Sequence, residues 1–113
     1  MATRERLICT SQDLMEQGQG VSFPVSESAG VTGFVVRYRG VVWGYINQCA
    51  HVPVPLDWQE GKFFDLTGHN LICATHGAQY EPETGACVLG PCKGKSLQKL
   101  CVTERDGYIY LVE

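Results

Sequence analysis

Two short stretches of the sequence, Cys49-Ala50-His51 and Cys73-Ala74-Thr75-His76, indicate which fold and which site this chain forms. Each stretch carries one cysteine and one histidine, and residues 52–72 lie between them. Each begins where an expected β-strand ends, so two adjacent loops would present two thiolates and two imidazoles to one centre. Thiolate and imidazole are ligands of metal ions and of iron–sulfur clusters. The predicted metal ligands are therefore Cys49, His51, Cys73 and His76.

The order of these ligands bears on the kind of centre. A structural zinc site usually groups cysteine with cysteine and histidine with histidine, whereas each loop here contributes one of each. That order fits a two-iron cluster with both thiolates on one iron and both imidazoles on the other. A mononuclear zinc site and a set of unrelated cysteines and histidines are the alternatives.

The two stretches and their surroundings resemble the Rieske [2Fe–2S] family. His76-Gly77-Ala78 resembles the family's histidine–glycine motif, residues 80–85 resemble the strand and turn after it, and Gly90-Pro91 resembles the loop that covers the cluster. The likeness extends over roughly residues 21–112, and in size the chain is similar to the stand-alone Rieske-type ferredoxins of bacterial ring-hydroxylating dioxygenase systems.

The resemblance implies an all-β fold, an antiparallel β-sandwich or barrel with a small cluster-binding subdomain made of two loops. It implies a single domain over residues 1–113, with the cluster-binding subdomain at roughly 47–92. It implies one [2Fe–2S] cluster per chain, bound by the four ligands named above. Around the ligands it places Gly77, Ala78, Tyr80 and Pro91.

Short β-rich segments separated by turn residues independently indicate a mainly antiparallel β fold. Arg39-Gly40 and Asp106-Gly107 predict hairpin turns, and residues 81–85 predict a turn that uses proline and glycine. Ser11 is expected to cap a brief helical turn through Asp13 and Glu16. The expected strands are 6–9, 21–25, 34–38, 41–47, 70–73, 78–80, 86–89, 100–104 and 108–112.

Departures from the family pattern bear on the reduction potential. High-potential members carry a disulfide between the cluster loops, at positions that match Val54 and Thr75, so that disulfide is not expected here. Ala78 replaces a serine that donates to the cluster, and a lost donor lowers the potential. We expect the lower half of the range of about −150 to +300 mV. Tyr80 either supplies a hydroxyl to a ligand sulfur or packs in the core.

The remaining cysteines and His69 are not expected to bind the cluster. Cys9 and Cys101 fall in expected strands and are predicted to be buried thiols. Cys87 and Cys92 could form a redox pair, but the favoured expectation is that Cys92 simply lines the cluster pocket. His69 is predicted to be an exposed loop histidine.

The segment between the cluster loops is longer than the shortest ferredoxins need. Its extra residues, 56–65, include Trp58, Phe63 and Phe64, which are expected to pack onto the domain; a docking surface is the alternative. Residues 52–55 form either an apolar docking rim or a rigid loop folded over the cluster.

The composition argues against several classes of function. The net charge is −3, and Lys93, Lys95 and Lys99 form only a local basic patch, so no nucleic-acid partner is expected. No segment approaches the ~20 apolar residues that span a bilayer, and the N-terminus lacks a secretory signal, which predicts a cytoplasmic protein without a membrane partner. After the cluster takes two histidines, only His69 remains, too few for the catalytic iron of an oxygenase.

The predicted function is that of a single-electron carrier from a reductase to an oxygenase-type acceptor, not itself an enzyme, and a monomer or weak oligomer. The alternatives are a small Rieske-like subunit of a larger reductase, such as nitrite reductase, and a structural zinc-binding module.

Overall fold

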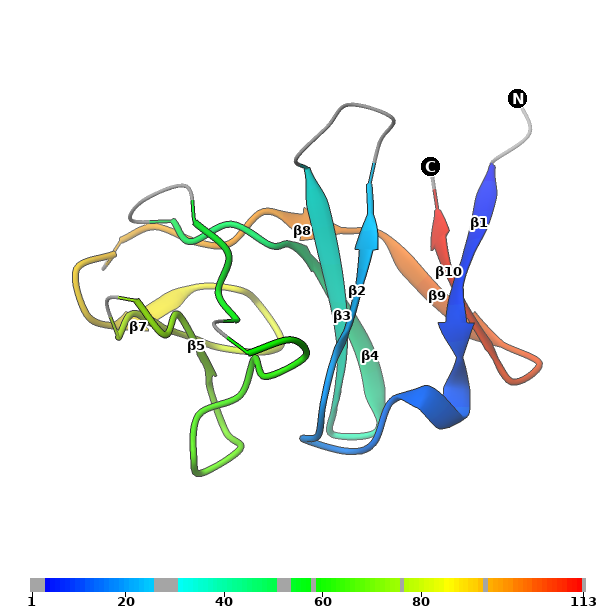
Figure 1. Ribbon diagram of the computed structural model, residues 1–113, viewed down its shortest axis with the longest axis horizontal. Helices are drawn as coiled ribbons and strands as arrows, with labels where there is room; N and C mark the ends of the chain where they lie inside the picture. The colour runs from blue at the N-terminus through cyan, green and yellow to red at the C-terminus, as the bar shows by residue number, and fades with distance from the viewer. Residues whose placement is uncertain are drawn as a thin grey trace.

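The computed structural model describes residues 4–25, 31–50, 54–57, 59–75, 77–92 and 94–112, and these residues form three antiparallel sheets. Figure 1 shows the sheets in a row, with β5 and β7 at one end, the sheet of β2, β3, β4 and β8 in the middle, and β1, β9 and β10 beside both chain termini. This all-β architecture confirms the expected fold class.

The middle sheet consists of β2 (Val21–Pro24), β3 (Thr32–Tyr38), β4 (Val41–Ile46) and β8 (Lys99–Leu100). Side chains of β3 alternate between two cores: Phe34 belongs to one, and Val35 to the other. Both faces are therefore buried. The hairpin between β3 and β4 turns at Arg39 and Gly40, whose φ angles of 53° and 76° match the two-residue turn predicted from the sequence.

The sheet beside the termini consists of β1 (Glu5–Thr10), β9 (Val102–Arg105) and β10 (Tyr108–Val112). Between β1 and β2 lies one 3-10 turn, η1 (Ser11–Asp13). Its cap is Thr10 rather than the expected Ser11, because the Asp13 carboxylate accepts from both the backbone N–H and the hydroxyl of Thr10, each at 3.0 Å. No membrane-spanning candidate occurs among the helices of the described residues.

The third sheet contains only short strands, β5 (Leu71–Ile72), β6 (Gln79–Tyr80) and β7 (Cys87–Leu89). Their inner side chains join β3 and β4 in one core, which holds four of the six cysteines. The core residues are Phe34, Val36, Tyr45, Cys49, Leu56, Phe63, Leu71, Cys73, Ala78, Tyr80, Cys87, Cys92 and Leu97.

Two expectations about the segment 100–104 were wrong. The segment is not one strand: Leu100 pairs with Gly44 of the middle sheet, whereas Val102 pairs with Leu111 of the terminal sheet. The chain crosses between the sheets at Cys101, whose carbonyl accepts from the Val112 N–H at 2.9 Å. At this crossing Cys101 is exposed, not buried as expected.

Candidate metal centre

The first cluster loop follows β4 and is closed by polar contacts at its base. Oδ1 of Asn47 accepts from the Leu56 N–H at 2.9 Å, and its Nδ2 donates to Asp57 at 3.0 Å. Above this base, the Cys49 N–H donates to the Val54 carbonyl at 2.8 Å. These bonds bring the outgoing and returning chain together, and they place Cys49 in the core with only 4% exposure.

The second loop is a tight turn between β5 and β6. The Cys73 N–H donates to the Ala78 carbonyl, and the Gly77 N–H donates to the Cys73 carbonyl, both at 2.8 Å. Gly77 has a φ of 72°, in the left-handed region that glycine adopts without strain. Cys73 is fully buried. The Ala74 N–H donates to the Leu56 carbonyl at 3.1 Å, so the second loop is bonded to the base of the first.

Tyr80 links β6 to the first loop. Its hydroxyl oxygen lies 3.2 Å from Cys49 Sγ and accepts from the Ala50 N–H at 2.9 Å. Burial, and then the hydrogen bond to Cys49, raise the pKa of the Tyr80 hydroxyl. The hydroxyl therefore keeps its proton and can donate it to a thiolate sulfur. Tyr80 is also fully buried. Its side chain therefore packs in the core and also contacts a sulfur atom, which were the two alternatives from the sequence.

The described residues fit the sulfur half of a two-iron centre. Cys49 and Cys73 lie in one buried cluster, on two loops that are bonded to each other, and one sulfur has a hydroxyl beside it. The predicted ligands His51 and His76 lie outside the described residues. Within the described ranges no group of three or more cysteine, histidine or acidic side chains is arranged around a metal position.

Cys87 and Cys92 form a disulfide, with Cα atoms 5.8 Å apart. The favoured expectation, an unbridged Cys92 that only lines the pocket, was wrong. Cys87 lies in β7, and Gly90-Pro91 turns the chain back toward it. The turn between two cysteines five positions apart was the available sequence signal, although connectivity does not follow from spacing alone.

The segment between the loops packs onto the domain as expected, through aromatic contacts. Phe63 is fully buried and stacks on Phe34 with ring centroids 4.0 Å apart, and Phe64 lies 6.1 Å from the Tyr38 ring. Trp58 lies outside the described residues. His69 is exposed, as predicted.

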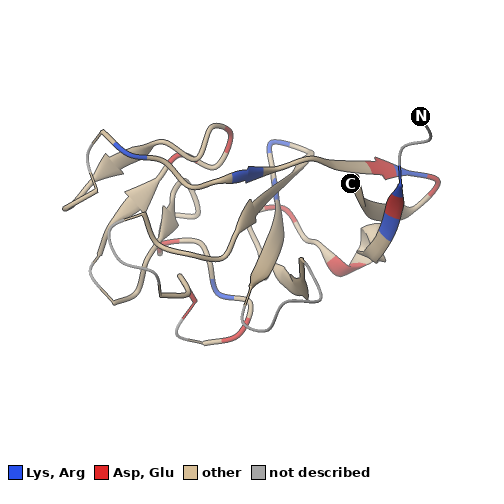
Figure 2. Ribbon diagram, turned by 90° about the horizontal axis from the view of Figure 1, so that it is seen from above, with Lys and Arg blue, Asp and Glu red and all other residues tan. Residues whose placement is uncertain are grey.

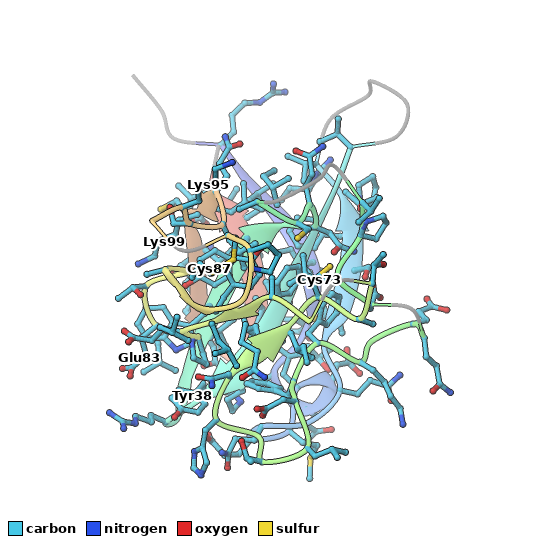
Figure 3. All side chains as sticks on the ribbon, turned by 90° about the vertical axis from the view of Figure 1, so that its left-hand side faces the viewer. Tyr38, Cys73, Glu83, Cys87, Lys95 and Lys99 are labelled. Carbon is cyan, nitrogen blue, oxygen red and sulfur yellow. A yellow bond between two sulfur atoms is a disulfide. The ribbon has the colours of Figure 1, made fainter. Side chains whose placement is uncertain are left out.

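The strands and turns around Cys73, Cys87 and Cys92 carry no charged side chain, although Lys95 lies beside Cys87 and Cys92. Residues 71–80 and 86–92 contain no Asp, Glu, Lys or Arg. Figure 2 shows charged positions sparse at the end of the molecule that carries both loops and more frequent around the two termini. In Figure 3, which faces this end, Cys73 and Cys87 lie toward the middle and Glu83 lies at the edge. The exposed residues here include Ala74, Thr75, Gly77, Val88, Leu89 and Pro91.

Two buried cysteines on two linked loops of an all-β scaffold are compatible with a metal centre. The Rieske [2Fe-2S] domain family matches residues 5–104, which is most of the chain. The protein therefore belongs to the Rieske [2Fe-2S] domain family. The chain matches no curated protein sequence.

Solved structures have the same fold. The ferredoxin of carbazole 1,9a-dioxygenase from Nocardioides aromaticivorans IC177 is 22% identical, with a TM-score of 0.73 and 95% of each chain covered. The Sphingomonas yanoikuyae B1 ferredoxin is also 22% identical, with a TM-score of 0.71 and coverage of 97% of this chain and 99% of that one. The terminal oxygenase of the Nocardioides system is 20% identical, with a TM-score of 0.77, and the match covers 96% of this chain but 29% of the oxygenase.

Proposed function

We propose that this protein is a single-electron carrier that holds one Rieske [2Fe–2S] cluster per chain. The observation that carries the proposal is the buried contact between Cys49 Sγ and the Tyr80 hydroxyl, on a loop bonded to the loop of Cys73. Membership of the Rieske family supports it. When bound, such a cluster supplies a reversible one-electron couple, and the protein supplies ligands, burial and hydrogen bonds.

The ligand roles follow from the donor types. Cys49 and Cys73 would bind one iron through sulfur, and His51 and His76 would bind the other through imidazole nitrogen. Residues 47–92 would form the cluster-binding subdomain of a single domain that spans 1–113. Gly77, Ala78, Tyr80 and Pro91 would surround the ligands.

The residues around the two cysteine ligands would determine how well the extra negative charge of the reduced cluster is stabilised. As a bound thiolate, Cys49 Sγ would accept from the Tyr80 hydroxyl 3.2 Å away, and a hydrogen bond to a charged sulfur is stronger than one to a neutral acceptor. Ala78 is fully buried and has no side-chain donor, so it adds none. One such side-chain donor favours a potential in the lower half of the Rieske range of about −150 to +300 mV.

The proposed partners are a reductase that supplies the electron and an oxygenase that accepts it, within a multi-protein system in the cytoplasm. The carrier itself catalyses no reaction in this scheme. One similar structure is described as a complex of reduced oxygenase and oxidised ferredoxin, with a TM-score of 0.74 at 19% identity. The uncharged residues 86–92, with exposed Leu89 and Pro91, suit brief docking through apolar contact.

A second candidate is a small subunit of a larger reductase. An open groove of about 490 Å³ beside the second loop favours it, because stable subunit contacts need more apolar area than the loop tips offer. Phe64, Leu66, Ile72 and Ala74 line this groove, and Leu66 is fully exposed. Stable co-purification with a large chain would favour this candidate over the carrier.

The decisive experiment is electron paramagnetic resonance on anaerobically reconstituted protein after dithionite reduction. We expect two irons and two sulfides per chain and the rhombic signal of a mixed cysteine- and histidine-ligated cluster. Cys73→Ala should abolish the signal, whereas Cys101→Ala, at an exposed cysteine outside the loops, should retain it. A colourless wild-type protein that takes up zinc but no iron would contradict the proposal and support the zinc-binding module.

A further inference from the structure

The Cys87–Cys92 disulfide encloses the loop that lies against the second cluster loop. We call residues 88–91 the cover segment; all four residues are exposed, while the two cysteines at its ends are buried. Both cysteines belong to the same core as Cys49 and Cys73. Figure 1 shows β7, which begins at Cys87, at the same end of the molecule as β5, which ends one residue before Cys73. The disulfide is therefore positioned to act on the cluster loops.

The tip of the cover segment touches the backbone of the second loop. A Cβ atom added to Gly90 would lie 2.9 Å from the Ala78 Cα and 3.4 Å from the Gly77 carbonyl oxygen. Only a glycine fits this close approach, and Gly90 also has a φ of 99°. The segment thus covers the residues that immediately follow the predicted ligand position 76.

The base of the cover segment connects to the first loop. Cys87 pairs with Tyr80 across β6 and β7, and the Tyr80 hydroxyl contacts Cys49 Sγ. The Cys87 N–H donates to the Lys95 carbonyl, and the Lys95 N–H donates to the Cys92 carbonyl, both at 2.9 Å. These backbone bonds would survive breakage of the disulfide, and so would the pairing of Leu89 in β7 with Gln79 in β6. Reduction would therefore free the tip of the cover segment, Gly90 and Pro91, without separating the strands.

We propose that the Cys87–Cys92 disulfide is a thiol–disulfide switch that controls how tightly the cover segment closes the second cluster loop. In the disulfide form, the cover segment is held on Gly77 and Ala78. In the dithiol form, the tip of the segment opens, and water reaches the loop more often. The effect on cluster retention rests on the proposed function, whereas the opening of the loop does not.

The switch is a two-electron reaction with a protein or small-molecule dithiol as reductant. One thiolate of the reductant attacks Cys87 Sγ, because Cys87 retains 9% exposure and Cys92 none. The Sγ–Sγ bond breaks, and Cys92 leaves as a thiolate that takes up a proton. The second thiolate of the reductant then attacks the mixed disulfide, which leaves Cys87 as a thiol and the reductant as its own disulfide.

The test compares reconstituted wild-type protein before and after anaerobic treatment with dithiothreitol. Alkylation followed by mass spectrometry counts the thiols, hydrogen exchange follows the Gly77 and Ala78 amides, and visible absorbance follows cluster loss to a chelator. We expect alkylation of Cys87 and Cys92 only after reduction. Exchange of the two amides should then rise about tenfold, since a cross-link of a short loop limits its opening, and cluster loss should accelerate several-fold.

Variants and an internal reference complete the design. Cys87→Ala/Cys92→Ala should behave like the reduced wild type and no longer respond to dithiothreitol, while Cys101→Ala should respond as the wild type does. The amides of Val35 and Val36 in β3 should exchange at an unchanged rate. Unchanged exchange at Gly77 after both cysteines are alkylated would overturn the proposal, and so would alkylation of both cysteines before reduction. Faster exchange without a cluster spectrum would support the switch and contradict the proposed function instead.

Discussion

The two ends of the molecule are held together by different means. At the end beside the termini, β1, β9 and β10 have four to six residues each and pair over most of their length. Ion pairs add to this end, such as Arg37 with Glu104 and Arg105 with Glu5. At the cluster end, β5, β6 and β7 have two or three residues each, and a disulfide and buried sulfur atoms lie among them.

This difference shows that the two ends depend on different kinds of interaction. Long antiparallel pairing fixes the register of the strands by many cross-strand contacts. The middle sheet lies between the end beside the termini and the loops, and its strand β4 leads into the first loop. Loops that present ligands cannot pair regularly, so they need side-chain bonds, tight turns and cross-links instead. We therefore expect the cluster end to open locally with less free energy than the sheets.

The largest effect should come from breaking the contact that joins the segment between the two loops to the middle sheet. Phe63→Ala removes a fully buried ring that stacks on Phe34 of β3. We expect the free energy of unfolding to fall by about 3–5 kcal/mol, measured by urea denaturation. The matched control is Leu66→Ala, at a fully exposed side chain three positions away, which should change stability by less than about 0.5 kcal/mol. Equal effects of the two variants would contradict this comparison.

The next effect concerns the polar contacts of the scaffold. Arg37 donates to both carboxylate oxygens of Glu104, at 3.0 and 2.6 Å, and to the Leu14 carbonyl at 2.9 Å. Arg37→Met should cost about 2 kcal/mol in thermal or urea unfolding, since hydrogen bonds from a charged group are lost. Arg39→Met is the control, because the Arg39 side chain is 71% exposed in its pair with Glu83. If Arg39→Met lowers the free energy of unfolding as much as Arg37→Met does, then the lower exposure and additional hydrogen bonds of Arg37 do not explain its effect.

Most of the scaffold could be predicted from the sequence, because its strands alternate and end at clear turns. Arg39-Gly40 and Asp106-Gly107 both adopt the positive φ angles that their turns need. The crossing at Cys101 could not be predicted, since the pattern of a strand does not say which neighbour it pairs with. The separate pairings of Leu100 and Val102 depend on tertiary contacts between distant segments of the chain.

At the cluster end the ligand set stays a prediction. The spacing of cysteine and histidine indicated the centre, and the structure places Cys49 and Cys73 in one buried core. With six cysteines, the pairing of Cys87 with Cys92 could not be chosen from spacing alone. The roles of His51 and His76 remain predictions, since these residues lie outside the described part of the chain.

At the cluster end, removal of one hydroxyl should have a smaller effect than the Arg37 variant. Tyr80→Phe keeps the buried ring and deletes the donor to Cys49 Sγ. The reduced cluster carries more negative charge, so loss of the donor should lower the reduction potential. About 1.4 kcal/mol for this bond corresponds to about 60 mV for one electron, measured by protein-film voltammetry. Tyr38→Phe, in β3 and remote from both cysteines, is the control; an unchanged potential in Tyr80→Phe would show that the contact is packing only.

A still smaller effect should appear in the pH dependence of scaffold stability. The hydrogen bond from Arg37 lowers the pKa of Glu104. The stabilisation is therefore complete above the pKa of Glu104 in the unfolded chain and is lost as pH falls through its lower pKa in the folded protein. The wild type should exceed Glu104→Gln by no more than about 1 kcal/mol at pH 7, and by progressively less in acid. A difference that grows toward acid pH would reverse the sign and contradict the pairing.

The smallest expected effect is on electron self-exchange between oxidised and reduced copies, measured by NMR line broadening at rising salt. This prediction rests on the proposed cluster. If two copies meet through the uncharged residues 86–92, Lys95 lies beside the contact, and most of the other charged residues lie elsewhere along a molecule 39 Å long. Salt screens charges farther apart than the Debye length of about 10 Å at 0.1 M, so the rate should change less than about twofold between 0.1 and 0.5 M. Leu89→Ala should slow the exchange, whereas Leu7→Ala, with the same 55% exposure at the other end, should not. A strong salt dependence with equal rates for both variants would place the contact on the charged scaffold instead, because screening acts only on charges that approach each other.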